Sequence, residues 1–168
     1  GEEEEAQCGY SVSLSASGHR MAIGTPNQYS MGHVQVYGWI NEEWIQIGGE
    51  IAEETVGGGI GSSVSLSSDG NRLAIGDYIY DGNGNDAGQV QVYEWRNDAW
   101  IQLGSGIDGE AADNRSGASV SLSADGYRVA IGAYYNDGNG HNAGHVRVYE
   151  SVNGTWQQIG EDIDGETE

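Results

Sequence analysis

The sequence predicts an all-β fold made of three four-stranded repeat units. One pattern of segments recurs three times along the 168 residues, 29 residues are glycine, and short segments alternate apolar and polar residues. A period of two is typical of strands, whereas no long stretch shows apolar residues at helical spacing. Glycine supplies the positive φ angles that tight turns between short strands require. Length as a prior allows one repeat domain over 1–168.

The first strand of each unit is predicted from a Gly-x-Ser-Val-Ser-Leu-Ser segment, which begins at Gly9, Gly61 and Gly117. Its alternation places Val12 and Leu14 on one face of the strand and serines on the other. Small residues on the serine face would let a neighbouring sheet approach closely.

The other three strands of each unit are predicted from shorter signatures. The second carries Arg-x-Ala-Ile-Gly, at 20–24, 72–76 and 128–132. The third carries Gly-x-Val-x-Val-Tyr, at 32–37, 88–93 and 144–149. The fourth carries Trp-x-Gln-Ile/Leu-Gly, at 44–48, 100–104 and 156–160. Short Asn-containing segments at 41–43, 97–99 and 153–155 indicate hairpin turns between the third and fourth strands.

The repeat divides the chain into units 9–60, 61–116 and 117–168, preceded by an acidic linker, 1–8. The linker aligns with the segments between repeats, so the chain starts and stops at nearly the same phase of the repeat. A segment of a longer array would have this form.

The charge is strongly acidic, with 26 Asp and Glu against six Arg and a net charge of −20. Such a field repels phosphate backbones, so it argues against nucleic-acid binding. It favours cationic partners and keeps a β protein soluble. No run approaches the roughly 20 apolar residues of a membrane span, so we expect no membrane insertion. A single cysteine, Cys8, excludes an intrachain disulfide.

The repeated motifs resemble a known family. Ser-x-Asp-Gly-x-Arg-x-Ala-Ile-Gly followed by Ala-Gly-x-Val-x-Val-Tyr-Glu is similar to the FG-GAP-type repeat of integrin α-like β-propellers, over residues 9–168. The resemblance implies one four-stranded β-propeller blade per unit. The repeat length fits, because propeller repeats of about 40 to 50 residues carry four strands.

The calcium loop of that family is degenerate in this chain. Where the family's calcium-binding repeat resembles Asp-x-Asn-x-Asp-Gly-x-x-Asp, this sequence has Ser121, Ser123 and Asp125, followed by Arg128. One carboxylate beside a guanidinium would bind calcium poorly, so we expect no cofactor there. The recurrent Arg is interpreted as a structural partner for a carboxylate such as Asp69 or Asp125, or for one on a neighbouring blade.

Two further loops offer weak candidate metal ligands. Alternating Asp and Asn separated by glycine can wrap calcium, because glycine permits the sharp turn and the side-chain oxygens coordinate. An ordinary Gly/Asn-rich turn explains the same pattern. The candidate ligands are Asp81, Asn83, Asp86, Asp137, Asn139 and Asn142.

Other single residues point mainly to structure. Trp44, Trp100 and Trp156 recur in strands, which favours packing between units over ligand stacking. Trp39 and Trp95 do not recur in the third unit, so they leave room for glycan stacking. His33 and His145 share one repeat position and are interpreted as surface or turn residues. Asn114 and Asn153 are weak glycosylation candidates.

Three blades leave an open arc, because closed propellers have four to eight. We therefore expect self-association into a ring or a filament. The alternative fold is a β-trefoil, which also has three four-stranded units. Against it, 52 to 56 residues is long for a trefoil unit, and the motif here is Trp-x-Gln rather than Gln-x-Trp.

These observations lead to the expectation of a non-enzymatic, extracellular or cell-surface scaffold that acts in adhesion or in filament and matrix assembly through protein partners. No Ser, Cys or Thr lies in a shared pattern with a histidine, and recurrence across units argues for structure, since an active site is normally needed once. The alternative function is a lectin-like module that binds glycans.

Overall fold

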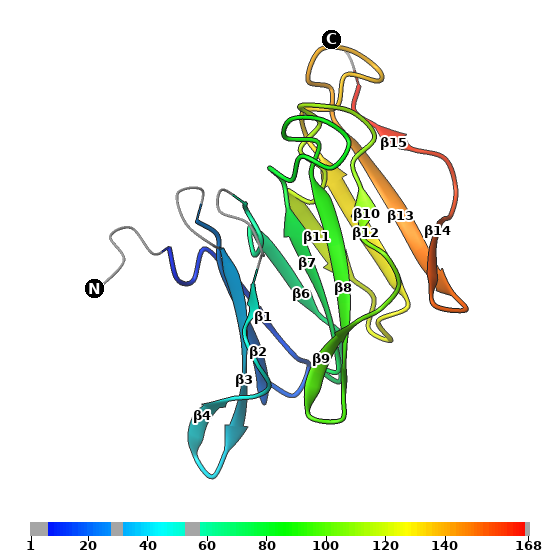
Figure 1. Cartoon of the computed structure of the whole chain (residues 1–168). Coiled ribbons are helices and arrows are strands. Elements are labelled where there is room, and N and C mark those ends of the chain that lie inside the picture. The colour runs from blue at the N-terminus through cyan, green and yellow to red at the C-terminus, as the bar shows by residue number, and fades with distance from the viewer. Residues whose placement is uncertain (1–6, 28–31, 53–57, 167–168) are drawn as a thin grey trace.

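The computed structural model describes residues 7–27, 32–52 and 58–166. Three antiparallel sheets stand side by side like a fan, with the first sheet of the chain at one end and the third at the other (Figure 1). Each sheet is one propeller blade, which confirms the predicted fold class. Within a blade the first four strands pair in chain order, and the last short strand pairs with the third.

The strands of the three blades match unit by unit. Blade 1 contains β1 (Ser11–Leu14), β2 (Arg20–Thr25), β3 (His33–Ile40), β4 (Glu43–Gln46) and β5 (Ile51–Ala52). Blade 2 contains β6 (Ser63–Leu66), β7 (Arg72–Asp77), β8 (Gln89–Arg96), β9 (Ala99–Gln102) and β10 (Ile107–Asp108). Blade 3 contains β11 (Ser119–Leu122), β12 (Arg128–Ala133), β13 (His145–Val152), β14 (Thr155–Gln158) and β15 (Ile163–Asp164).

The fourth strand of each blade is interrupted. In blade 1, β4 pairs with one end of β3 and β5 pairs with the other end, so both continue the same sheet edge. The β3–β4 turn is a two-residue hairpin in which Asn41 and Glu42 both have positive φ, 51° and 66°. Positive φ at both central residues is the type I′ geometry that suits twisted hairpins.

The core lies between the blades. We call the interface between two neighbouring blades a blade seam. At the first seam, small and β-branched residues of blade 1, including Ala22 and Val34, pack against Leu66, Leu73 and Ile75 of blade 2. The second seam repeats this arrangement between blades 2 and 3. Because blade 2 buries both faces and blades 1 and 3 each bury one face against it, the fold depends on stacking rather than on a closed barrel.

Three separate sheets stacked through their faces exclude the β-trefoil alternative. The first strands β1, β6 and β11 lie next to one another, as expected of the inner strands of a propeller. In the described part of the chain no helix could cross a membrane.

The recurrent Arg pairs with a carboxylate, as predicted, but in blades 2 and 3 that carboxylate is a glutamate on the adjacent strand rather than Asp69 or Asp125. Arg72 donates to Glu94 on the adjacent strand (3.1 Å) and to the Gly126 carbonyl of the next blade (3.3 Å), and it stacks on the Tyr127 ring at 3.7 Å. Asp69, the predicted carboxylate, instead accepts a hydrogen bond from Ser67 at 2.6 Å.

Arg128 has the same repeat position but a different environment. Asp125, its predicted partner, accepts a hydrogen bond from Ser123, and Arg128 itself pairs with Glu150 at 2.8 Å. Its side chain is 59% exposed, whereas that of Arg72 is 12% exposed. The difference arises because blade 3 has no following blade in this chain.

We predict that Arg72→Ala lowers the free energy of unfolding by about 2 to 3 kcal/mol, because it removes a charge-assisted hydrogen bond and a cation–π contact at a buried seam. Arg128→Ala should cost under about 1 kcal/mol, since an exposed ion pair contributes little. Urea unfolding midpoints of the two variants measure the difference. Equal losses in both would contradict the assignment of Arg72 to the seam.

Candidate functional site

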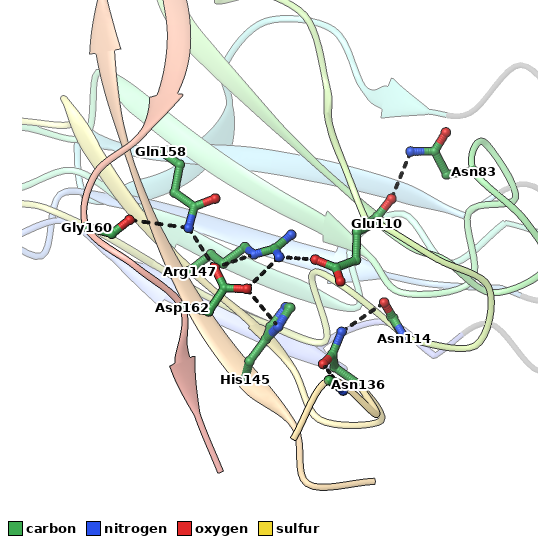
Figure 2. A network of polar contacts seen from close by, with 11 residues as sticks. Asn83, Glu110, Asn114, Asn136, His145, Arg147, Gln158, Gly160 and Asp162 are labelled. Carbon is green, nitrogen blue, oxygen red and sulfur yellow. Dashed lines mark hydrogen bonds and ion pairs between the residues drawn. The ribbon is translucent and has the colours of Figure 1, made fainter. Parts of the chain in front are cut away.

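A charged cluster joins blades 2 and 3, and Figure 2 shows it at close range. Arg147 of β13 lies at its centre. Its Nε and Nη2 donate to the two carboxylate oxygens of Asp162, at 2.8 and 2.5 Å, and Nη2 also contacts the carboxylate of Glu110. Asp162 lies just before β15 in blade 3, whereas Glu110 follows β10 in blade 2. The cluster therefore spans the second blade seam.

Two further side chains contact Asp162. The Gln158 amide donates to Asp162 Oδ1 at 2.7 Å, and His145 Nδ1 lies 3.7 Å from Asp162 Oδ2. The His145 side chain is only 6% exposed, while those of Arg147 and Glu110 are 20% and 42% exposed. Glu110 is therefore the most accessible member of the cluster, Arg147 and Asp162 are partly exposed, and His145 is the buried one.

The charges stabilise one another. The hydrogen bond from Arg147 is the main cause that lowers the pKa of Asp162, and it outweighs the opposing effect of burial. Burial lowers the pKa of Arg147, but the hydrogen bond and the negative charge of Asp162 overcome this and raise that pKa. At neutral pH the pair is therefore a carboxylate and a guanidinium in a fixed bidentate geometry.

Among the described residues, this cluster occurs only at the second blade seam. The position of Arg147 is Gln35 in blade 1 and Gln91 in blade 2, and the position of Asp162 is Gly106 in blade 2. Gln91 accordingly donates to Gln89 at 2.8 Å, and Gln89 donates to the Asp108 carboxylate at 2.7 Å, so this network contains no cation. Blade 3 thus departs from the repeat by replacing a glutamine with a cation that two carboxylates contact.

Glu110, His145 and Asp162 lie close enough to offer one ligand atom each to a metal ion. Arg147, however, lies between the two carboxylates and contacts both. A divalent cation would have to displace the guanidinium against its charge. The donor set therefore favours a neutralised ion-pair network over a metal site.

The predicted metal ligands lie elsewhere, in the loops after β7 and β12. Asp81 Oδ1 accepts from the Asp86 amide at 2.9 Å, and Asp137 Oδ1 accepts from the Asn142 amide at 2.6 Å. Asn83 donates to the Gly109 carbonyl at 2.9 Å. Asn139 makes the equivalent bond to Gly165. Asp81 and Asp137 therefore stabilise their own loops. Asn83 and Asn139 bind each loop to the residue that follows the last short strand of the same blade.

The remaining predicted residues are not brought to the cluster. Trp39 and Trp95 pack on Trp44 and Trp100 of their own hairpins, with ring centroids 5.3 Å apart in both pairs. Trp156 donates to the Leu103 carbonyl across the second seam at 2.9 Å, in agreement with a packing role.

The two glycosylation candidates differ in exposure. Asn114 is buried, at 7% exposure, and accepts a hydrogen bond from Asn136 at 3.0 Å. Asn153 is exposed in the β13–β14 turn. Only Asn153 is therefore accessible for modification in the folded chain.

Sequence reasoning missed Arg147, Glu110 and Asp162 as a group and interpreted His145 as a surface or turn residue. The structure corrects that assignment, because His145 is nearly buried beside Asp162. A signal was available, since Arg147 breaks the Gln35 and Gln91 pattern. Proximity to Glu110, 37 positions away in another blade, could not be read from the spacing.

No family model and no curated protein sequence matches the chain. The resemblance to FG-GAP repeats therefore stays a prediction. Solved structures do match in fold, and the chain spans about two-fifths of their length.

A candidate 6-phosphogluconolactonase from Bacteroides uniformis is 15% identical, with a TM-score of 0.64, over 92% of this chain and 40% of its own. The periplasmic gluconolactonase PpgL of Pseudomonas aeruginosa is 19% identical, with a TM-score of 0.62, over 94% and 42%. Sqt1 of Saccharomyces cerevisiae is 14% identical, with a TM-score of 0.56, over 95% and 36%.

These structures overturn the expectation of a non-enzymatic scaffold for adhesion or for filament and matrix assembly. At this level of identity they establish the fold, and two of the proteins are named as sugar lactonases. The inference from repeat architecture to a lack of catalysis was wrong, because fold does not fix function and the same blades occur in proteins named as enzymes.

We predict that Asp162→Asn destabilises the fold at pH 7 and that the loss disappears in acid. The pKa of Asp162 is lowered in the folded state. Its stabilising effect is therefore present above the unfolded value of about 3.9 and is lost as the pH falls through the folded value. Urea unfolding from pH 7 to pH 2 measures the effect, with Glu50→Gln, which has no arginine beside it, as control. A loss that persists at pH 2 would contradict the ion-pair explanation.

We predict that millimolar calcium leaves the melting temperature unchanged, because Asp81 and Asp137 already accept hydrogen bonds inside their loops. A ligand at 100 times its Kd would add about 2.7 kcal/mol, which differential scanning calorimetry detects easily. Asp137→Ala should lower the melting temperature equally with calcium and with chelator. A saturable rise with calcium that Asp81→Ala together with Asp137→Ala abolishes would show that the loops bind the ion.

Proposed function

We propose that the chain provides three blades of a propeller hydrolase that opens a neutral sugar lactone, with Glu110 and Arg147 as its reactive groups. One observation carries this proposal: the charged cluster breaks a repeat that is otherwise regular at this position. A structural feature of the blades would recur in each blade, whereas an active site is needed once. The names of two similar structures supply the class of reaction.

Lactone hydrolysis needs two groups that the cluster contains. Water must lose a proton as its oxygen attacks the ester carbonyl, and the Glu110 carboxylate, 42% exposed, can accept that proton. The carbonyl oxygen then becomes an oxyanion, which the Arg147 guanidinium can stabilise. The ring C–O bond breaks, the leaving alkoxide takes the proton back from Glu110, and the product is an open hydroxy acid.

Two neighbouring side chains of blade 3 position Arg147. Bidentate bonds from Arg147 to Asp162 fix the plane of the guanidinium, and Gln158 holds Asp162 in turn. The pKa of Arg147 is raised by this partner after burial is overcome, so the group stays charged while an oxyanion forms. A preorganised cation needs no reorganisation when charge develops in the transition state.

The net charge of the chain favours uncharged lactones over phosphorylated ones. At −20, the chain repels a phosphorylated substrate, and its excess of carboxylates lowers the local concentration of anions. A neutral lactone approaches without this penalty. The proposed substrate is therefore an uncharged aldonolactone rather than its phosphate ester.

We predict that the chain releases acid from glucono-1,5-lactone faster than the spontaneous reaction, as measured by titration at constant pH. Arg147→Gln restores the residue of blades 1 and 2 and should lower kcat by about 100-fold or more, since removing one oxyanion donor costs that much. Glu110→Gln should have a similar effect. Glu50→Gln, at the position in blade 1 that corresponds to Asp162, should leave the rate unchanged.

Two results would reject this function. The first is a rate equal to the spontaneous one for the parent chain. The second is a parent rate that Arg147→Gln and Glu110→Gln leave intact while both variants unfold at the parent's urea midpoint. The 6-phosphorylated lactone serves as the second substrate and should be hydrolysed more slowly, with the difference shrinking at high salt.

A further inference from the structure

Three asparagines of this chain are followed directly by glycine: Asn83, Asn139 and Asn153. We propose that the turn between β13 and β14 is a site of spontaneous deamidation, in which Asn153 converts to aspartate and isoaspartate while the fold protects Asn83 and Asn139. The sequence makes the three pairs alike, and their surroundings in the structure separate them. The reaction is independent of the proposed lactone hydrolysis.

Deamidation at an Asn-Gly pair is an intramolecular substitution. The backbone nitrogen of the glycine attacks the side-chain carbonyl carbon of the asparagine, and the new C–N bond closes a five-membered succinimide ring. The bond to the side-chain amide nitrogen breaks, and that nitrogen leaves as ammonia with the proton of the attacking amide. Water then opens the ring at one of its two carbonyls and gives aspartate or isoaspartate. Glycine favours the reaction because it has no side chain to hinder the approach.

The loop after β7 holds both reacting groups of the first pair. Nδ2 of Asn83 donates to the Gly109 carbonyl at 2.9 Å, which fixes the side chain. The amide of Gly84, which would attack, donates to the Asp81 carbonyl at 3.2 Å. Gly84 also lies against Ala112, because a Cβ on Gly84 would come within 2.9 Å of the Ala112 Cβ. Ring closure at Asn83 must therefore break two hydrogen bonds and move a packed segment of backbone.

The loop after β12 repeats this arrangement in blade 3. Nδ2 of Asn139 donates to the Gly165 carbonyl at 2.9 Å, and the amide of Gly140 donates to the Asp137 carbonyl at 3.2 Å. Burial is not what protects these sites, since Asn83 and Asn139 are both exposed. The hydrogen bonds distinguish them from an unrestrained Asn-Gly pair.

The third pair is unrestrained. Among the described residues, no hydrogen bond engages the side chain of Asn153 or the amide of Gly154. Within the same part of the chain, a Cβ on Gly154 would have nothing within 4 Å. The turn residues have positive φ, 52° and 79°, and the backbone must leave this geometry before the ring closes. Positions 152–155 are all exposed, so the tip of the hairpin can open locally at little cost.

The exposure of this turn does not depend on where the chain ends. Blade 2 has a blade on either side, and its corresponding turn residues, Asn97 and Asp98, are exposed as well. The blades differ in the second turn residue, which is Glu42 in blade 1, Asp98 in blade 2 and Gly154 in blade 3. A side chain at that residue hinders the attack of its own nitrogen. Of the three hairpins, only that of blade 3 therefore combines asparagine with glycine.

The products change the turn in two ways. Either product adds a negative charge to a chain whose net charge is already −20. Isoaspartate also places the side-chain carbon in the main chain, which lengthens a turn whose register pairs Val152 with Thr155. The Gly154 carbonyl lies close to Gly104 of blade 2, since a Cβ on Gly104 would come within 2.7 Å of it. A longer turn therefore alters a contact across the second seam.

Peptide mapping of the folded parent chain, incubated at mildly alkaline pH, tests the inference. Cleavage after arginine places the three Asn-Gly pairs in three different peptides, 73–96, 129–147 and 148–168. Mass spectrometry detects the exchange of the amide for a carboxyl group, and chromatography separates aspartate from isoaspartate. Asn153 should convert at least about 10-fold faster than Asn83 or Asn139, since two hydrogen bonds must break before either of these reacts.

The same incubation in urea separates the effect of the fold from that of the sequence. In the unfolded chain the three pairs should convert at comparable rates, because nothing holds Asn83 and Asn139. Gly154→Asp restores the turn of blade 2 and should slow the conversion of Asn153 to the rate of the protected sites or below. Gly49→Ala, which adds a methyl group in open space, should leave that conversion unchanged.

Circular dichroism checks that both variants are folded, and the comparison of folded with unfolded parent suffices if Gly154→Asp is not. Equal conversion at the three sites of the folded chain would overturn the inference, as would a preference for Asn153 that persists in urea. An Asn153 that stays intact in the folded chain while it converts in urea would do the same. So would unchanged conversion of Asn153 in folded Gly154→Asp.

Discussion

The close approach of backbone at the blade seams is the constraint on which the rest of this structure depends. Gly24 and Gly76 lie against carbonyls of the next blade, and any side chain there would force the sheets apart. Because the sheets come so close, valine, leucine and isoleucine from both blades interlock in two buried cores. The serines of the inner strands then bridge the seam through hydrogen bonds. Packing, polar contacts and the fan shape all follow from two small residues per seam.

The part of each seam that the third strand of a blade forms tolerates variation in sequence. At the inner strands the repeat is nearly identical, but at β3, β8 and β13 the corresponding residues are Gln35, Gln91 and Arg147. Polar side chains at this depth can exchange neutral hydrogen bonds for ion pairs without moving the backbone, because the register is fixed elsewhere. A charged site could thus arise in one blade at little cost to the fold.

Repetition gives little information about function. The recurring residues of this chain are those that make a blade, such as the Val-Ser-Leu strand and the Arg-x-Ala-Ile-Gly strand. The expectation of a non-enzymatic scaffold rested on the residues that recur, and it is overturned by the similar solved structures that are named as lactonases.

The sequence by itself determined the strands, their order within each unit, and the hairpins at Asn41, Asn97 and Asn153, because these depend on local alternation and turn chemistry. It also determined the need for close approach, through Gly24 and its repeats. Only the tertiary structure decided which groups meet across a seam. Arg147 pairs with Asp162 and Glu110, and Arg72 pairs with Glu94 rather than Asp69. These partners come from different strands or blades, and their distances depend on how the sheets stack, which no spacing along one chain records.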